Sequence, residues 1–165
     1  MNTAHCDWFS PNVEITLDDL KSVLVTALPN TSIVIKSQSN GNTSYSGGIW
    51  RGSLTSLDVA QMYRIKVSTA CEISLTGVPI NSAEHPVTIS YGANWIGFPL
   101  SQSITLGNAF AGFAIRGDRV KSQAGAAQYN GTMWRPSFSL TPGNGYIYKS
   151  NVTDNRTFTF PANTK

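Results

Sequence analysis

Hydrophobic positions follow a helical period in only two short stretches of the chain. In the first stretch, apolar residues recur three or four positions apart between residues 20 and 28, which gathers them on one face of an α-helix. Thr16 followed by Asp19 forms a capping pair just before this stretch. We therefore predict one short amphipathic helix over residues 17–28.

The second stretch, residues 106–114, keeps the same period but contains Gly107 and Gly112. Each glycine costs up to about 1 kcal/mol inside a helix, so we expect a shorter helix here. The remaining apolar positions alternate with polar ones and are separated by Asn, Gly and Pro clusters, which is typical of β-strands. The predicted strands are 32–38, 43–51, 62–68, 72–76, 87–91, 119–123, 127–135, 145–149 and 156–160.

The second half of the chain repeats the first. Lys36-Ser37-Gln38 is matched by Lys121-Ser122-Gln123, and Trp50-Arg51 is matched by Trp134-Arg135. The offset between matched residues drifts only from 89 to 83 positions along the chain. Such a drift indicates short loop insertions around a shared scaffold, so we interpret the chain as two copies of one motif.

These patterns predict a mostly β fold with one or two short helices. We expect two duplicated β-rich lobes, sandwich- or barrel-like, related by a pseudo-two-fold axis and tightly packed. The lobes are assigned to residues 1–80 and 87–165, and the loop between them is too short for a flexible linker. The whole chain should form one compact unit.

Composition and charge indicate which classes of protein and of partner fit this chain. Only 13% of the residues are charged, and Ser, Thr, Asn and Gly fill the gaps between apolar runs, which suits a secreted or cell-surface β-protein. The net charge of +3 comes from cations spread singly along the chain, so we do not expect a nucleic-acid partner. No stretch approaches the roughly 18 apolar residues of a membrane span, so we expect no membrane insertion.

The chain carries little catalytic chemistry. Its 9 acidic residues include no pair placed alike in the two copies, as a glycoside hydrolase would need. The two histidines stand alone, and Cys6 and Cys71 match no zinc spacing. These two cysteines either pair in a single bridge or fill strand positions as small apolar residues. We expect no enzyme activity, no metal and no cofactor.

Several of these motifs together resemble a known repeat. The segment Asn94-Trp95-Ile96-Gly97-Phe98-Pro99-Leu100, with Lys121-Ser122-Gln123 and Gly145-Tyr146-Ile147-Tyr148-Lys149, resembles a tandem repeat module of large exported bacterial proteins. The resemblance covers nearly the whole chain, although the first copy opens with Cys6-Asp7-Trp8-Phe9-Ser10 instead of two nearby Trp residues. In that family the repeats accompany surface adhesins and polysaccharide-degrading enzymes, which implies binding rather than catalysis.

Aromatic residues beside polar ones suggest what is bound. Sugar rings stack their C–H faces on Trp or Tyr, while amide and basic groups bond to the hydroxyls. We therefore predict a non-catalytic carbohydrate-binding module that anchors a larger secreted or surface protein to polysaccharide. The candidate ligand-binding residues are Tyr45, Trp50, Arg51, Lys36 and Gln38 in the first copy and Tyr129, Trp134, Arg135, Lys121 and Gln123 in the second.

Each candidate also has a structural explanation. We assign Trp8 and Trp95 to the core, whereas Trp50 and Trp134 fit either the core or an exposed hairpin. Lys36-Ser37-Gln38 also fits the solvated face of an edge strand. The alternative function is a structural or adhesive spacer that mediates protein–protein or cell-surface contacts. The expected partners are a polysaccharide or glycan and other domains of the parent protein, and we expect a monomer.

Overall fold

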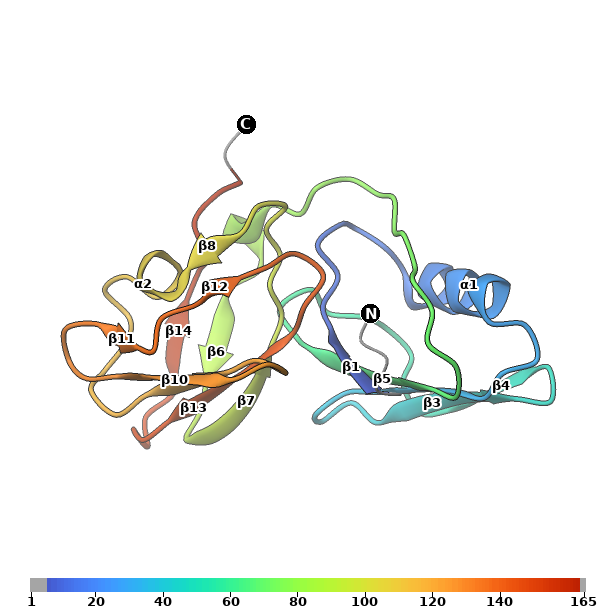
Figure 1. Cartoon of the computed structure of the whole chain (residues 1–165), viewed down its shortest axis with the longest axis horizontal. Coiled ribbons are helices and arrows are strands. Elements are labelled where there is room, and N and C mark those ends of the chain that lie inside the picture. Colours follow the sequence, from blue (N-terminus) through green and yellow to red (C-terminus); the bar gives the residue numbers. More distant parts are fainter. Residues whose placement is uncertain (1–5, 164–165) are drawn as a thin grey trace.

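Two five-stranded antiparallel sheets and two α-helices form the framework of the protein (Figure 1). The computed structural model describes residues 6–163, and of Cys6 only the backbone. The predicted mostly β class is confirmed. Sheet 1 contains β1 (Cys6–Phe9), β2 (Ile33–Lys36), β3 (Asn42–Ser46), β4 (Ile49–Gly52) and β5 (Tyr63–Val67), and sheet 2 contains β7 (Gly92–Ile96), β9 (Arg119–Lys121), β10 (Ala126–Tyr129), β11 (Trp134–Arg135) and β13 (Tyr146–Ser150).

The two sheets have corresponding strand orders. Sheet 1 runs β1-β5-β2-β3-β4, and sheet 2, read from the edge at the centre of the molecule, runs β7-β13-β9-β10-β11. We call sheet 1 with its helix lobe 1. Lobe 2 consists of sheet 2, the second helix and two small two-stranded sheets. These small sheets pair β6 (Val87–Ile89) with β14 (Arg156–Phe158) and β8 (Ile104–Thr105) with β12 (Ser139–Leu140).

Helix α1 (Leu17–Ala27) forms where the sequence predicts it. The Thr16 hydroxyl accepts a hydrogen bond from the backbone N–H of Asp19 at 3.1 Å, and the Asp19 carboxylate accepts one from the backbone N–H of Thr16 at 2.9 Å. The bond from the Thr16 backbone N–H, and a second bond that the Thr16 hydroxyl donates to the same carboxylate oxygen at 2.7 Å, lower the pKa of Asp19. The helix buries Leu17, Leu20 and Leu24 against sheet 1. Helix α2 (Leu106–Ala109) is only one turn long, as the glycines around it predict.

Several strand predictions were wrong in detail. The segments 43–51 and 127–135 are hairpins rather than single strands. In the first hairpin, Gly47 and Gly48 adopt positive φ angles of 59° and 85°, which reverse the chain between β3 and β4. Residues 72–76 form no strand. Strands β1 and β7 were not predicted. They pair with β5 and β13, and they place Trp8 and Trp95 on the edge strands of the two sheets.

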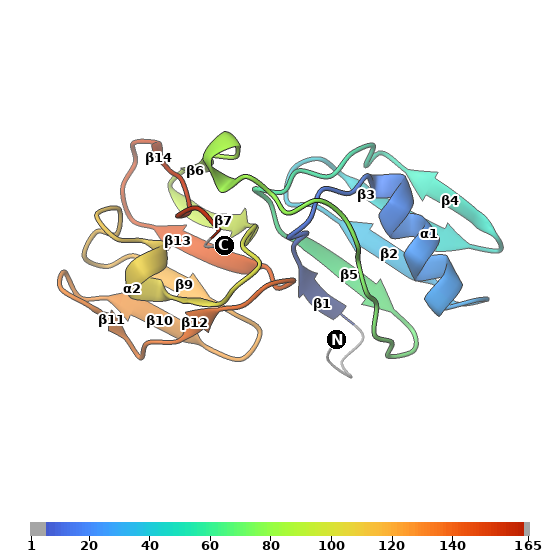
Figure 2. The same ribbon diagram turned by 90° about the horizontal axis from the view of Figure 1, so that it is seen from above.

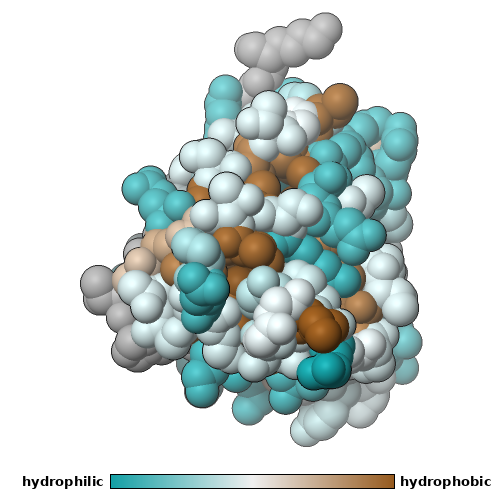
Figure 3. Space-filling model, turned by 90° about the vertical axis from the view of Figure 1, so that its right-hand side faces the viewer, coloured by the Kyte–Doolittle hydropathy of each residue, from teal (hydrophilic) through white to brown (hydrophobic). Residues whose placement is uncertain are grey.

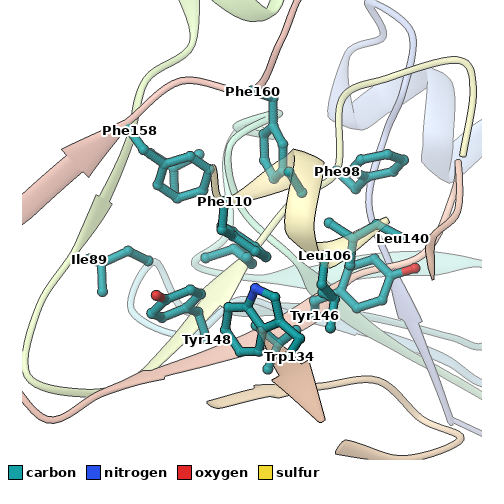
Figure 4. Close-up of a cluster of buried hydrophobic side chains, with 14 of the residues drawn as sticks. Ile89, Phe98, Leu106, Phe110, Trp134, Leu140, Tyr146, Tyr148, Phe158 and Phe160 are labelled. Carbon is teal, nitrogen blue, oxygen red and sulfur yellow. The ribbon is translucent and has the colours of Figure 1, made fainter. Parts of the chain in front are cut away.

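Each lobe has its own hydrophobic core. The core of lobe 1 is largely aliphatic and joins α1 to sheet 1. The core of lobe 2 is aromatic, with Phe110 of the turn after α2 surrounded by rings from several strands (Figure 4). Its buried aromatic residues are Phe98, Phe110, Trp134, Tyr146, Tyr148, Phe158 and Phe160.

The lobes are tightly packed through reciprocal backbone contacts. The carbonyl of Trp8 in β1 accepts a hydrogen bond from the N–H of Gly145 at 2.7 Å, next to β13 of the other lobe. The carbonyl of Trp95 in β7 accepts one from the N–H of Met62 at 3.4 Å, next to β5. The outer side of each edge strand, β1 or β7, is therefore hydrogen-bonded to the other lobe. Its partner is the residue just before β13 or β5.

Both helices lie on the same side of the molecule. In Figure 1 they stand above the two sheets, which line the lower side, and Figure 2 looks down onto the helices with the sheets beneath them. We call the helix-free side of the two sheets the open face. Within residues 6–163, no helix has the length and apolar character that crossing a membrane requires.

Candidate functional site

The aromatic residues predicted to bind sugar lie on the helix side of their sheets, not on the open face. Tyr45 is the cross-strand partner of both Ile33, a core residue, and Trp50, so all three point toward α1. The rings of Tyr45 and Trp50 are 5.2 Å apart, and Lys21 of α1 holds its Nζ 5.6 Å from the Trp50 ring centroid. Trp50 is half-buried by these contacts.

Trp134 is a core residue. Its side chain is only 5% exposed and packs against Phe110 and Tyr148 at centroid distances of 5.7 and 6.3 Å (Figure 4). The ring of Tyr129 lies 5.4 Å from it on the neighbouring strand. No ring face of Trp134 is left for a sugar. Trp134 pairs with Tyr129 across the strands as Trp50 pairs with Tyr45, so packing accounts for both aromatic pairs.

Gln38 and Gln123 join the lobes. The side-chain oxygen of Gln38 accepts a hydrogen bond from the backbone N–H of Trp95 at 2.6 Å, and its amide nitrogen donates to the carbonyl of Ala93 at 2.7 Å. The side-chain oxygen of Gln123 accepts from the N–H of Trp8 at 2.8 Å. Each glutamine thus bonds to the edge strand of the other lobe, a role that single-lobe reasoning missed.

The four predicted basic residues do lie on the open face. Side chains alternate between the two sides of a strand, and the buried residues fix which side faces the core. Lys36 follows buried Ile35, and Arg51 follows helix-facing Trp50. By the same alternation Lys121 and Arg135 are exposed on sheet 2. Because β2 and β9 are the middle strands of their sheets, the edge-strand explanation for Lys36 was wrong.

Four further cations share this face. They alternate with the buried residues of β5, β9 and β13. Residues scattered singly along the sequence are therefore gathered on one surface, which the sequence did not reveal. Within residues 6–163, no cation of the open face forms an ion pair with a carboxylate. The eight open-face cations are Lys36, Arg51, Arg64, Lys66, Arg119, Lys121, Arg135 and Lys149.

The centre of the open face is formed by one guanidinium and two indoles. Arg64 of β5 places its Cζ 4.4 Å from the ring centroid of Trp95 and 5.5 Å from that of Trp8. Both tryptophans are half-buried and lie where the lobes meet, rather than inside a core. The Nε of Arg64 is buried with no hydrogen-bond partner. The three side chains form a cation–π stack that spans the two lobes.

Strand register extends this stack into a row across the open face. In sheet 1, Lys36 pairs with Arg64, which pairs with Trp8. In sheet 2, Lys121 pairs with Ile147, which pairs with Trp95. The row therefore has indoles at its centre and a lysine on each side, and it can offer aromatic surface and N–H donors to one extended ligand. We call it the central row.

A separate cleft lies on the helix side of the junction, with a volume of about 710 Å³. Its apolar wall includes Phe9, Leu75 and Phe138, and two acidic residues, Asp7 and Glu72, also line it. The carboxylates make this cleft unsuitable for an anionic ligand, in contrast to the open face.

Metal-ligating and thiol side chains also occur in the described part of the chain. No group of three His, Cys, Asp or Glu side chains within residues 6–163 is arranged to hold a metal ion. Cys71 is a free thiol, and burial raises its pKa. The side chain of Cys6 lies outside the described residues.

Comparison of the chain with protein-family models, with curated proteins and with solved structures finds no match. The geometry of the open face and of the cleft is therefore the basis for assigning a function.

Proposed function

We propose that this chain is a non-catalytic carbohydrate-binding module that attaches a larger secreted or surface protein to polysaccharide through the central row of its open face. The observation that carries the proposal is the pair of half-buried indoles, Trp8 and Trp95, at the centre of a face of exposed polar side chains. A sugar ring can stack its C–H face on exposed indole surface while N–H groups around it bond to hydroxyls.

The arrangement of the two lobes supports the same proposal. Two lobes built on one strand order place Trp8 and Lys36 opposite Trp95 and Lys121. An extended polysaccharide that crosses the junction would meet Trp and Lys side chains in both lobes. Two weak sites that bind one ligand together give a higher avidity than either site alone. We propose that the lobes derive from one duplicated motif.

The rival spacer function has less support. A docking surface for another protein is usually a contiguous apolar patch of several hundred Å². The end of the molecule drawn in Figure 3 has separate small hydrophobic patches among polar residues. The most exposed large apolar residues of the described chain, Val78 and Tyr91, lie in two separate loops.

The test is affinity electrophoresis of the purified chain through gels that contain a panel of plant, algal and host polysaccharides. We expect retardation on at least one of them. A Trp8→Leu, Trp95→Leu double variant should migrate freely, whereas Trp50→Leu should still be retarded because Trp50 faces α1. Thermal melting followed by circular dichroism checks that each variant is folded.

Two results would contradict the proposal. Free migration of the unmodified chain on every glycan would favour the spacer. Retardation that survives in the folded double variant would move the binding site away from the central row.

A further inference from the structure

Charge is segregated on this molecule. Eight of the 12 Lys and Arg residues occupy open-face positions of the two sheets. All 9 Asp and Glu residues fall within residues 6–163, and none occupies an open-face strand position. Asp7 is the only acidic residue within a described strand, and it pairs with buried Ile65 on the helix side. A chain of net charge +3 therefore presents a face of about eight positive charges.

The charges on this face also repel one another. Lys36 lies directly opposite Arg64, and Arg119 lies directly opposite Lys149 in neighbouring strands. Strands in a sheet are about 4.8 Å apart, and like charges placed opposite each other destabilise a sheet. No carboxylate of the described chain relieves either pair. Binding of an anion would relieve this repulsion.

We infer that the ligand is an anionic polysaccharide, with carboxylate or sulfate groups repeated along the chain, lying across the strands of the open face. This inference rests on the proposed carbohydrate binding and adds the ligand class. Lys36 and Lys121 contact acidic groups on either side of the junction, and Arg64 contacts one at its centre. Neutral polysaccharides lack the groups that these cations select.

Arg64 has the geometry of an anion receptor. A guanidinium offers planar N–H donors that bond a carboxylate or sulfate in pairs, and the two indoles fix the orientation of this one. The matching position in lobe 2 is Ile147, which pairs with Trp95 as Arg64 pairs with Trp8. The central row is therefore not symmetric. Because only lobe 1 has an arginine at this position, Arg64 determines where an acidic group of the bound polysaccharide lies along the row.

The shape of the face favours a polysaccharide over nucleic acid. Proteins that read duplex DNA insert a helix or a β-ribbon into a groove, whereas the open face consists of two sheets with both helices on the far side. Proteins that bind single strands stack successive bases on a series of aromatic rings. The described part of the central row has two indoles, and both contact the same guanidinium.

The test compares matched ligands. Binding of the full chain is measured by isothermal titration with polygalacturonate and its fully methyl-esterified form, and with dextran sulfate and dextran, at 50 and 300 mM NaCl. We expect at least tenfold tighter binding to the anionic member of one pair, and a loss of at least tenfold at the higher salt. A Lys36→Gln, Lys121→Gln double variant should lose at least tenfold in affinity. A control double variant, Lys21→Gln and Arg116→Gln, removes equal charge away from the open face and should bind normally.

Each outcome is decisive. Equal, salt-insensitive binding of neutral and anionic members would overturn the inference and leave carbohydrate binding intact. No binding to these ligands or to the wider glycan panel would overturn the proposed function itself. Tighter binding to a single- or double-stranded oligonucleotide than to any anionic glycan would overturn the inference in favour of nucleic acid. Equal loss in both double variants would mean that net charge, and not the open face, governs binding.

Discussion

Lobe 2 buries the carboxylate of Asp118 completely. Its Oδ2 accepts hydrogen bonds from the Tyr148 hydroxyl at 2.5 Å and from a guanidinium nitrogen of Arg156 at 2.9 Å. The Arg156 guanidinium also donates to the carbonyl of Phe113 at 2.8 Å. Burial of the ring, followed by the hydrogen bond to Asp118, raises the pKa of Tyr148 well above its ordinary value.

This environment predicts a loss of stability at alkaline pH. Above pH about 10 the Tyr148 of the unfolded chain ionises while that of the folded chain stays protonated, so stability present below that pH falls as pH rises. Tyr148→Phe should reduce the alkaline slope of the unfolding free energy by up to about 1.4 kcal/mol per pH unit. Urea unfolding between pH 8 and 11.5 measures it.

The unfolding free energy of Tyr148→Phe should still fall somewhat at alkaline pH, because burial also raises the pKa of Tyr63 in lobe 1. Tyr91→Phe is the matched control, since Tyr91 is 67% exposed and its replacement should leave the slope unchanged. Parallel curves for wild type and Tyr148→Phe would show that Tyr148 ionises alike in both states.

At the scale of elements, the junction depends on one close backbone approach beside β7. A Cβ at Gly97 would lie 2.2 Å from the carbonyl oxygen of Val59 and 2.9 Å from that of Gln61. Because both neighbours are backbone atoms, the edge of β7 would have to move away. We predict that Gly97→Ala destabilises the fold by roughly 1–3 kcal/mol, measured by urea unfolding at pH 7.

Gly125→Ala provides the comparison. A Cβ at Gly125 meets nothing within 4 Å, so this change should be neutral or slightly stabilising. If both variants lose the same stability, the close approach at Gly97 is not what holds the junction. Full stability of Gly97→Ala would mean that the loop before β5 yields easily.

Periodicity predicted the helices and many of the strand segments, but it did not predict the two hairpins, β1, β7 or the site. The apolar stripe and the Thr16–Asp19 cap gave α1, because both depend on neighbours within one turn. The pairing within the β3–β4 hairpin was not predicted. A single strand over residues 43–51 has no turn, whereas the turn at Gly47 and Gly48 places Tyr45 opposite Trp50. A binding face depends on which side of a strand each residue occupies, and that side is fixed by contacts between distant strands.

The matched segments Lys36-Ser37-Gln38 and Lys121-Ser122-Gln123 were visible in the sequence, but the role of their glutamines was not. Gln38 and Gln123 each bond to the edge strand of the other lobe, whereas the sequence pattern predicts that they contact a ligand. Arg64 was overlooked because its match, Ile147, is apolar. The residue proposed to select the ligand is thus one that the two halves do not share.

At the scale of the whole molecule, the two lobes have separate cores but a shared set of backbone hydrogen bonds. The loop before β5 also contributes Ala60 to the core of lobe 2. Unfolding either lobe would therefore break these junction bonds and expose apolar surface of the other lobe that is covered in the native state, both of which cost free energy. We predict one cooperative transition for the chain.

Two probes that report on different parts of the chain can test this cooperativity. Tryptophan fluorescence follows Trp8 and Trp95 at the junction together with Trp50 and Trp134 inside the lobes, while far-ultraviolet circular dichroism follows all strands. In urea their curves should coincide, because loss of the junction removes the edge partners of both sheets at once. Two resolved transitions would instead mean that each core is stable alone, and the central row could then open without unfolding either lobe.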